Sequence, residues 1–174
     1  ATLMIAAVIL HQMRVYFTGA YRRPRELNWM IGMCLLLVTL GLGFTGYSLV
    51  FEQLSYWGAT VGGNILDQVP LVGSLAKNML LAGDQYNEQT LPRFYILHAA
   101  VMPVTLIMLI GIHIAFVRMH GVTELRFEDE PPEQQRGHFN FFPDHMLTEL
   151  TLGLVLMIVL SALATLFPAH LGPK

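Results

Sequence analysis

The chain has 174 residues, of which 54% are hydrophobic and 13% are charged, and its formal net charge is −2. Since a typical soluble domain carries about 25% charged residues, this composition excludes an ordinary soluble domain and indicates an integral membrane protein. No basic tract suggests nucleic-acid binding, and the single cysteine, Cys34, excludes an internal disulfide or a cysteine-only metal site.

Hydropathy predicts four membrane-spanning helices, over about 1–17, 29–50, 94–117 and 146–167. The first apolar stretch opens directly at Ala1, so we expect its helix to begin in sequence upstream of that residue. Cys34 lies within the second stretch, where an apolar run predicts a packed thiol.

The connections between these spans differ in charge. The short connection 18–28 is rich in arginine, and the polar connection 118–145 combines arginines with an acidic run and prolines, a composition typical of disorder. Because positive charge favours the cytoplasmic side, we expect both connections in the cytoplasm and segment 52–92 on the outer face.

Segment 51–92 is too long for a plain connector. Its middle, over 68–81, could form short amphipathic helices on the outer face of the membrane. Such a cap often covers a ligand pocket, although a pair of surface helices without a ligand remains the alternative.

Three histidines, His11, His98 and His113, lie inside otherwise apolar helical stretches. A histidine at bilayer depth is costly and often functional, although a lone one is more often a hydrogen-bonded core residue. The separation between His98 and His113 corresponds to roughly 22 Å along a helix, which suits two metal centres stacked across a membrane. His11 and His113 fall at matching inner depth and could hold one metal ion, whereas the partner of His98 would lie just before residue 1.

Two glycines of the second span, Gly32 and Gly46, repeat nearly the same separation. Glycine costs about 1 kcal/mol in a helix interior and is useful where a bulky flat group approaches the backbone. Arg14 and Arg93 lie near His11 and His98 and could pair with the carboxylates of such a group, haem being one, or could anchor the span ends at the membrane interface.

Five stretches together carry a family resemblance: His11–Trp29, Gly43–Leu49, Tyr56–Thr60, Leu91–His98 and Phe142–Pro168. They resemble cytochrome b of the quinol:cytochrome c oxidoreductase family, the cytochrome bc complexes, in a bacterial form. The resemblance runs from within the family's second transmembrane helix to the end of its fifth. One departure is the run Leu49-Val50-Phe51-Glu52-Gln53, which stands where the family usually has Leu-Pro-Trp-Xaa-Gln.

The resemblance implies an all-α transmembrane helical bundle with short amphipathic surface helices. Its expected parts are a dihaem N-terminal-type bundle over 1–118, a polar cytoplasmic loop over 119–145, and the start of the C-terminal-type region over 146–174.

The resemblance also implies two b-type haems. His11 and His113 would ligate the inner haem, and His98 would ligate the outer haem together with a histidine upstream of Ala1. Further haem contacts are expected at Gly32, Gly46, Arg14 and Arg93. The outer quinol pocket would be lined by Tyr47, Trp57, Gly58, Ala59 and Thr60. Candidates at the inner quinone site are Arg118 and Glu149, although a glutamate near a helix start also simply favours the helix dipole.

The function implied is electron transfer from quinol at the outer site, through both haems, to a quinone at the inner site, coupled to proton translocation. The chain would be a quinol:cytochrome c oxidoreductase subunit, active only within its complex. Implied partners are a Rieske iron-sulfur protein, a c-type cytochrome subunit, quinone and the lipid bilayer, in a homodimeric complex of the bacterial inner membrane. Two alternatives stay open: a dihaem anchor of another quinone-linked dehydrogenase, and a transporter with structural histidines and no cofactor.

Overall fold

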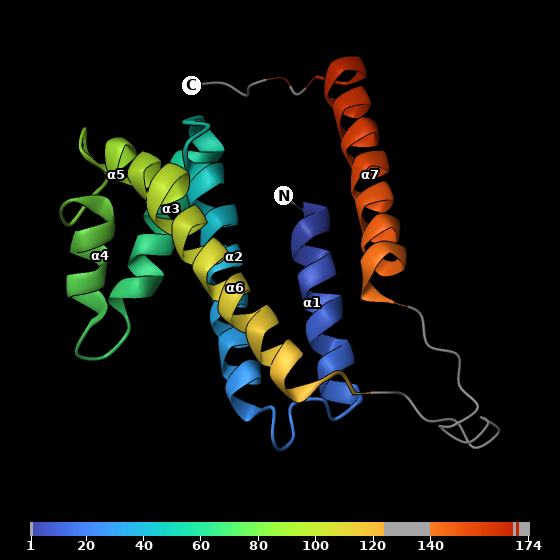
Figure 1. Ribbon diagram of the computed structural model, residues 1–174. Helices are drawn as coiled ribbons and strands as arrows, with labels where there is room; N and C mark the ends of the chain where they lie inside the picture. Colours follow the sequence, from blue (N-terminus) through green and yellow to red (C-terminus); the bar gives the residue numbers. More distant parts are fainter. Residues whose placement is uncertain (1, 124–139, 169, 171–174) are drawn as a thin grey trace. The chain divides into compact units, whose positions relative to one another are not determined.

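The computed structural model describes residues 2–123, 140–168 and 170, and every regular element among them is helical (Figure 1). These residues fall into two compact units, one on each side of the gap in the described chain. The all-α fold class is therefore confirmed for the part of the chain that the structure describes.

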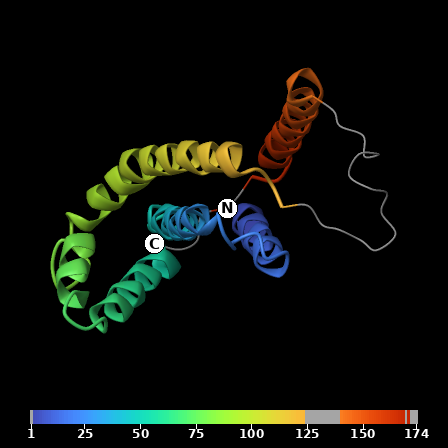
Figure 2. The same cartoon turned by 60° about the horizontal axis from the view of Figure 1, so that its bottom comes forward.

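The first unit is built on α1 (Thr2–Phe17), α2 (Glu26–Ser48) and a long curved helix. That helix consists of α5 (Thr90–Ile96), the π-helical turn η1 (Leu97–Val101) and α6 (Met102–His120), which run on without a break (Figure 2). The π-helical turn ends two residues before Pro103, and this proline lies in the first turn of α6. Because proline has no N–H to donate to the preceding turn, the helix widens there, and His98 lies in the widened turn.

Packing in this unit centres on α2. Both α1 and α6 pack against α2, but no Cα atom of α1 lies within 8 Å of a Cα atom of α6. The close approach of α6 to α2 uses Gly41, since a Cβ at that position would lie 2.9 Å from Cε of Met102. Both α1 and α6 therefore pack against α2 without a close approach between their own backbones.

Two shorter helices, α3 (Gln53–Asp67) and α4 (Gly73–Leu81), precede α5 and pack against each other. A capping box between Glu52 and Ser55 begins α3. The fully buried apolar residues of the unit gather where these helices meet α5, and they are Ala59, Leu81 and Phe94.

The amphipathic helix predicted over 68–81 is partly right. Only residues 73–81 are helical, 68–72 form the turn before them, and a longer helix, α3, lies ahead of that turn. The turn is tight, because a Cβ on Gly73 would lie 2.5 Å from the carbonyl oxygen of Asp67. A glycine is therefore required where α4 starts against the end of α3.

Three described helices are long and apolar enough to cross a membrane: Glu26–Ser48, Thr90–His120 and Phe141–Leu166. They confirm the second, third and fourth predicted spans as helices and support a multi-pass membrane protein. The first predicted span is present only as the shorter apolar helix α1. Its 16 residues correspond to about 24 Å at ~1.5 Å per residue, less than the hydrocarbon core of about 30 Å.

The second unit consists of the π-helical turn η3 (Phe141–His145) and α7 (Met146–Leu166). Its large apolar side chains are exposed along the whole of α7, as expected for a helix that lipid or further helices surround. The polar connection predicted over 119–145 overlaps α6 and η3 at its ends, and its acidic run and expected disorder lie outside the described residues.

The prediction of a packed thiol at Cys34 is wrong. The side chain is exposed on α2. An apolar run shows that a helix is membrane-embedded but not which of its faces a neighbouring helix covers, so the sequence alone could not decide this point.

Candidate functional site

His11 and His113 face each other across the gap between α1 and α6. Their ring centres are 6.4 Å apart, and the ring planes are inclined by 77°. The two helices meet through these side chains, not through their backbones. The structure therefore brings together the two histidines that the sequence predicts as a pair.

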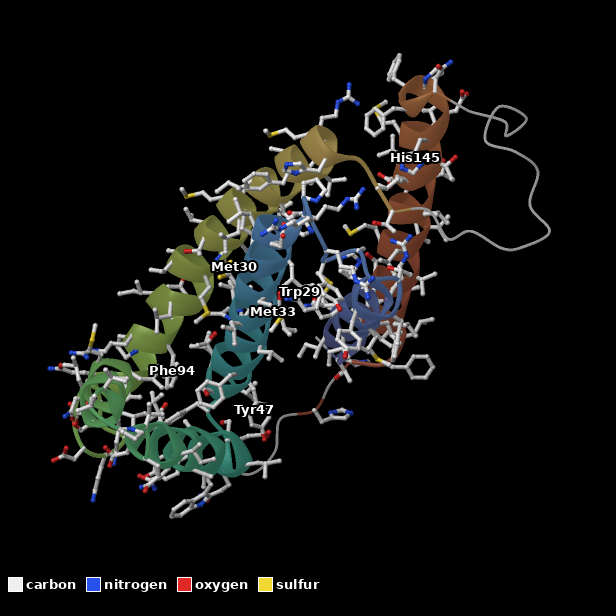
Figure 3. All side chains as sticks on the ribbon, turned by 90° about the horizontal axis from the view of Figure 1, so that it is seen from below. Trp29, Met30, Met33, Tyr47, Phe94 and His145 are labelled. Atoms are coloured by element: carbon white, nitrogen blue, oxygen red, sulfur yellow. The ribbon has the colours of Figure 1, made fainter. Side chains whose placement is uncertain are left out.

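A cavity of about 190 Å³ opens beside this histidine pair. It is lined by the end of α1, the connection to α2, the first turns of α2 and the end of α6. Figure 3 labels Trp29, one of the lining aromatics, near the start of α2. The remaining polar lining residues are Gln12, Arg14, Arg25, Asn28 and Thr123.

Three polar side-chain atoms at this cavity are buried without a hydrogen-bond partner among the described residues. They are Nδ1 of His113, Oδ1 of Asn28 and Oγ1 of Thr123, and the backbone of Asn28 lies close to the His113 ring. Because buried polar groups are normally hydrogen-bonded, these unpartnered atoms favour a site that completes its contacts with a bound group.

The two arginines of the cavity differ in what they contact. Arg25 donates to three carbonyl oxygens at the end of α6, those of His120, Gly121 and Val122, at 3.1 to 3.4 Å. Arg14 has no side-chain hydrogen bond or ion pair with any described residue. Arg14 therefore remains available for an anionic group, whereas Arg25 holds the helix end.

His98 occupies a second, separate environment in η1. A Cβ on Gly46 would lie 2.7 Å from Cε1 of His98, so the imidazole rests directly on the α2 backbone. The hydroxyl of Thr45 lies 3.1 Å from Nδ1 of the same ring. Gly46 is thus necessary for the position of His98, whereas a Cβ on Gly32 would make only ordinary contact, at 3.6 Å, with Cε1 of His113.

The histidine pair fits a haem iron better than a simple metal site. Among the described residues no group of three or more His, Cys, Asp or Glu side chains could hold a metal ion, so this part of the chain supplies too few ligands for a simple metal site. Two imidazoles that ligate one ion from opposite sides, through bonds of roughly 2.0–2.1 Å as for zinc, have ring centres about 6 to 6.5 Å apart. The observed separation of 6.4 Å matches that arrangement, and a haem requires only axial ligands from the protein.

The residues predicted for an outer pocket are only partly brought together. Tyr47 packs over Gly58, where a Cβ would lie 3.3 Å from Cε1 of the tyrosine. Trp57 is exposed and donates to Oε1 of Gln53 at 3.2 Å. Ala59 is fully buried in the core and offers no surface to a ligand, and the Thr60 hydroxyl donates to the backbone of α3.

Three other predicted residues do not line the cavity. The guanidinium of Arg93 donates to the carbonyl oxygens of Asn78 and Met79, at the end of α4. Arg118 is exposed in the last turn of α6. Glu149 belongs to the second unit, where its carboxylate lies 3.1 Å from Nε2 of His145.

The structure adds site residues that the sequence did not indicate. Thr45 at His98, and Gln12, Arg25 and Asn28 at the cavity, are all polar residues within or beside apolar helices. Their polarity could have marked them as candidate site residues. Polar residues at helix ends are common, however, and only the packing of the helices shows which of them face a histidine.

This chain is similar to one known protein family and to several of its characterised relatives. The sequence model of the family described as "Cytochrome b(N-terminal)/b6/petB" matches residues 2–173. The cytochrome b6 of Heliobacterium mobile is 43% identical over 124 residues, which cover 71% of this chain and 58% of that protein. The cytochrome b6 of Prochlorococcus marinus (strain MIT 9211) is 37% identical over 123 residues, which cover 71% of this chain and 56% of that protein.

Among solved structures, a chain of a hyperthermophilic respiratory Complex III matches with a TM-score of 0.72 and 25% sequence identity. The match covers 99% of this chain and 51% of that one. The chain therefore spans a little over half the length of the curated relatives it matches, and about half of the structural one.

Proposed function

Since this chain belongs to the cytochrome b(N-terminal)/b6/petB family, we propose that it is the electron-transfer subunit of a quinol-oxidising membrane complex of the cytochrome bc type. Quinol would be oxidised at the outer side and a quinone reduced at the inner side, with electrons passing through two b-type haems and protons translocated. Of the relatives, the Complex III chain is named for a respiratory complex, which supports an assembly with other subunits.

The observation that carries the proposal is the facing pair His11 and His113, with ring centres 6.4 Å apart beside a cavity. Bound haem supplies one-electron redox chemistry that no side chain of this site provides. His11 and His113 would hold the inner haem from α1 and α6. The guanidinium of Arg14, which pairs with no described residue, lies at the same cavity, where it would neutralise a carboxylate of the cofactor.

His98 would hold the outer haem, opposite a histidine from outside the given sequence. Gly46 leaves the face of α2 open for the imidazole. Gly32 would make room for the inner haem in the same way, because it has no side chain to fill that space.

At the outer quinol site we place Tyr47, Trp57, Gly58 and Thr60, with Ala59 supporting them from the core. The ring of Tyr47 lies against Gly58, and the exposed Trp57 offers an apolar surface to a quinone ring. At the inner quinone site, Arg118 would attract the developing negative charge, and Glu149 would hand a proton to the reduced quinone.

The proposed complex contains a Rieske iron-sulfur protein and a c-type cytochrome subunit, and is a homodimer in the bacterial inner membrane. Within it the chain would contribute to quinol:cytochrome c oxidoreductase activity.

The proposal is tested on the full-length protein in its complex by a reduced-minus-oxidised absorption spectrum and a redox titration. We expect a b-type haem band that titrates in two steps and is reduced on addition of quinol. A single step would contradict the two-haem arrangement. Absence of a haem band would favour a transporter, and reduction only by the substrate of a partner dehydrogenase would favour an anchor subunit.

A further inference from the structure

Thr45 forms the polar contact to His98 inside the bundle. The residue is 1% exposed, and its hydroxyl lies 2.8 Å from the carbonyl oxygen of Gly41 and 3.1 Å from Nδ1 of His98. It thus links the backbone of α2 to the imidazole in η1.

The hydroxyl has a single proton to donate. The short contact to Gly41, one helical turn earlier, uses that proton in the way buried threonines commonly do. Other acceptors are farther away, with Leu42 O at 3.4 Å and Sδ of Met102 at 3.8 Å. Toward His98 the hydroxyl oxygen can therefore only accept, so Nδ1 of the ring carries the hydrogen and Nε2 keeps its lone pair.

We propose that Thr45 is the positioning residue of the outer haem site: it fixes the tautomer and orientation of His98 and lowers the reduction potential of the haem that His98 binds. This inference rests on the proposed function, in which His98 is a haem ligand.

Two neighbouring residues of α2 act together on the ring. Thr45 fixes Nδ1, while the bare backbone of Gly46 lies against Cε1, where a Cβ would be 2.7 Å away. The imidazole is thereby held both by a hydrogen bond and by contact. A half-turn of the ring about the Cβ–Cγ bond would exchange Nδ1 with Cδ2 and would therefore break the hydrogen bond to Thr45.

The other proposed haem ligands have no hydroxyl in this position. Among the described residues no side-chain hydroxyl bonds to His11 or to His113, and the backbone of Asn28 lies close to the His113 ring. A hydrogen bond accepted from a ligating imidazole raises the basicity of that ligand and favours the more positive, oxidised iron. Loss of the Thr45 hydroxyl should therefore affect one haem and not the other.

The decisive experiment is a redox titration of the full-length protein in its complex, comparing Thr45→Val and Thr45→Ser with the parent. Valine keeps the shape but removes the hydroxyl, so we expect the outer haem to become easier to reduce by several-fold to about tenfold, up to 59 mV for one electron. Serine should restore the parent potential, and the inner haem should stay unchanged throughout. The electron paramagnetic resonance signal of the oxidised outer haem, recorded without turnover, should shift in parallel.

Thr39 provides a matched control on the same helix. It is 9% exposed and donates to Leu35 O at 2.8 Å, the same type of contact, but bonds to no described histidine. Thr39→Val should leave both potentials at their parent values, and an equal shift in this variant would overturn the inference.

If both haems are retained in Thr45→Val and the reduction potential of the outer haem is unchanged, the inference about Thr45 is wrong. The proposed function would not be affected by that result. Retention of both haems in His98→Ala would instead contradict the proposed ligand. If the valine variant does not hold the outer haem, the same titration is made on Thr45→Ala and Thr45→Ser. An outer-haem potential that is raised in the alanine variant and returns to the parent value in the serine variant supports the inference. Equal outer-haem potentials in the two variants refute it.

Discussion

His11 and His113 approach to a ring separation of 6.4 Å although their helices, α1 and α6, have no Cα atoms within 8 Å of each other. Both helices pack against their common neighbour α2. A flat group that enters between the two rings would therefore meet side chains before it met the backbone of either helix.

Replacement of His113 should abolish one haem and spare the other. His113→Ala would remove the imidazole that we propose holds the inner haem from α6, so we expect the reduced-minus-oxidised spectrum of the full-length complex to lose the inner-haem component. His120→Ala on the same helix is the control, since that ring stacks on Phe116 at 5.7 Å and does not line the cavity. A spectrum unchanged by His113→Ala would remove the ligand assignment.

Gly46→Ala should disturb the outer haem far more than an alanine elsewhere in the bundle. The new methyl group would lie 2.7 Å from Cε1 of His98, closer than van der Waals contact allows, so the imidazole must move. We expect loss or a marked shift of the outer-haem step in a redox titration.

Gly111→Ala is the matched control for that substitution. A Cβ at Gly111, within α6, meets nothing within 4 Å, and alanine favours a helix by about 1 kcal/mol over glycine. The control should bind both haems and be at least as stable as the parent. Equal behaviour of the two variants would contradict a steric role for Gly46.

The long helices and the histidine pair were predictable from sequence, and the reason is physical. A membrane-spanning helix must be apolar along its whole length whatever its neighbours are. Hydropathy alone therefore located the helices Glu26–Ser48, Thr90–His120 and α7 to within a few residues. The shared depth of His11 and His113 followed from counting residues along two such helices.

The contacts between helices were not predictable in this way. Thr45 and His98 are 53 residues apart in sequence, and Arg25 meets carbonyl groups 95 to 97 residues away. Such contacts depend on the rotation and register of one helix against another, which no local pattern encodes. The same reason explains the error at Cys34. It also explains why the hydrogen bonds from Arg93 to the end of α4 could not be predicted.

Arg25→Ala should loosen the C-terminal end of α6. The guanidinium donates to three carbonyl groups there, where Gly121 at φ +70° ends the helix. Hydrogen bonds from a charged donor are worth about 1.5–3 kcal/mol, so we expect a lower thermal midpoint and faster proteolysis after α6. Arg23→Ala is the control, because its ion pair with Glu26 is exposed and contributes little. Equal losses in both variants would contradict a specific role for Arg25.

We expect the ionisation of Tyr86 to lower the stability of the protein at alkaline pH. Its ring contacts Tyr56 and Phe51 beside α3, with centres 5.0 and 6.0 Å away. Its hydroxyl oxygen is buried without a hydrogen-bond partner among the described residues. Burial, and secondarily the neighbouring Tyr56, raise the pKa of Tyr86 above its usual value.

Because the pKa of Tyr86 is higher in the folded than in the unfolded protein, its contribution to stability is fully present below the unfolded value of about 10 and is lost as the pH rises through the folded value. Tyr86→Phe keeps the ring contacts and has no proton to lose, so its thermal midpoint, followed by circular dichroism, should fall less than that of the parent between pH ~8 and ~11. Tyr95→Phe, at an exposed tyrosine of the same unit, should behave like the parent. If Tyr86→Phe and the parent lose stability equally, Tyr86 does not carry the alkaline transition.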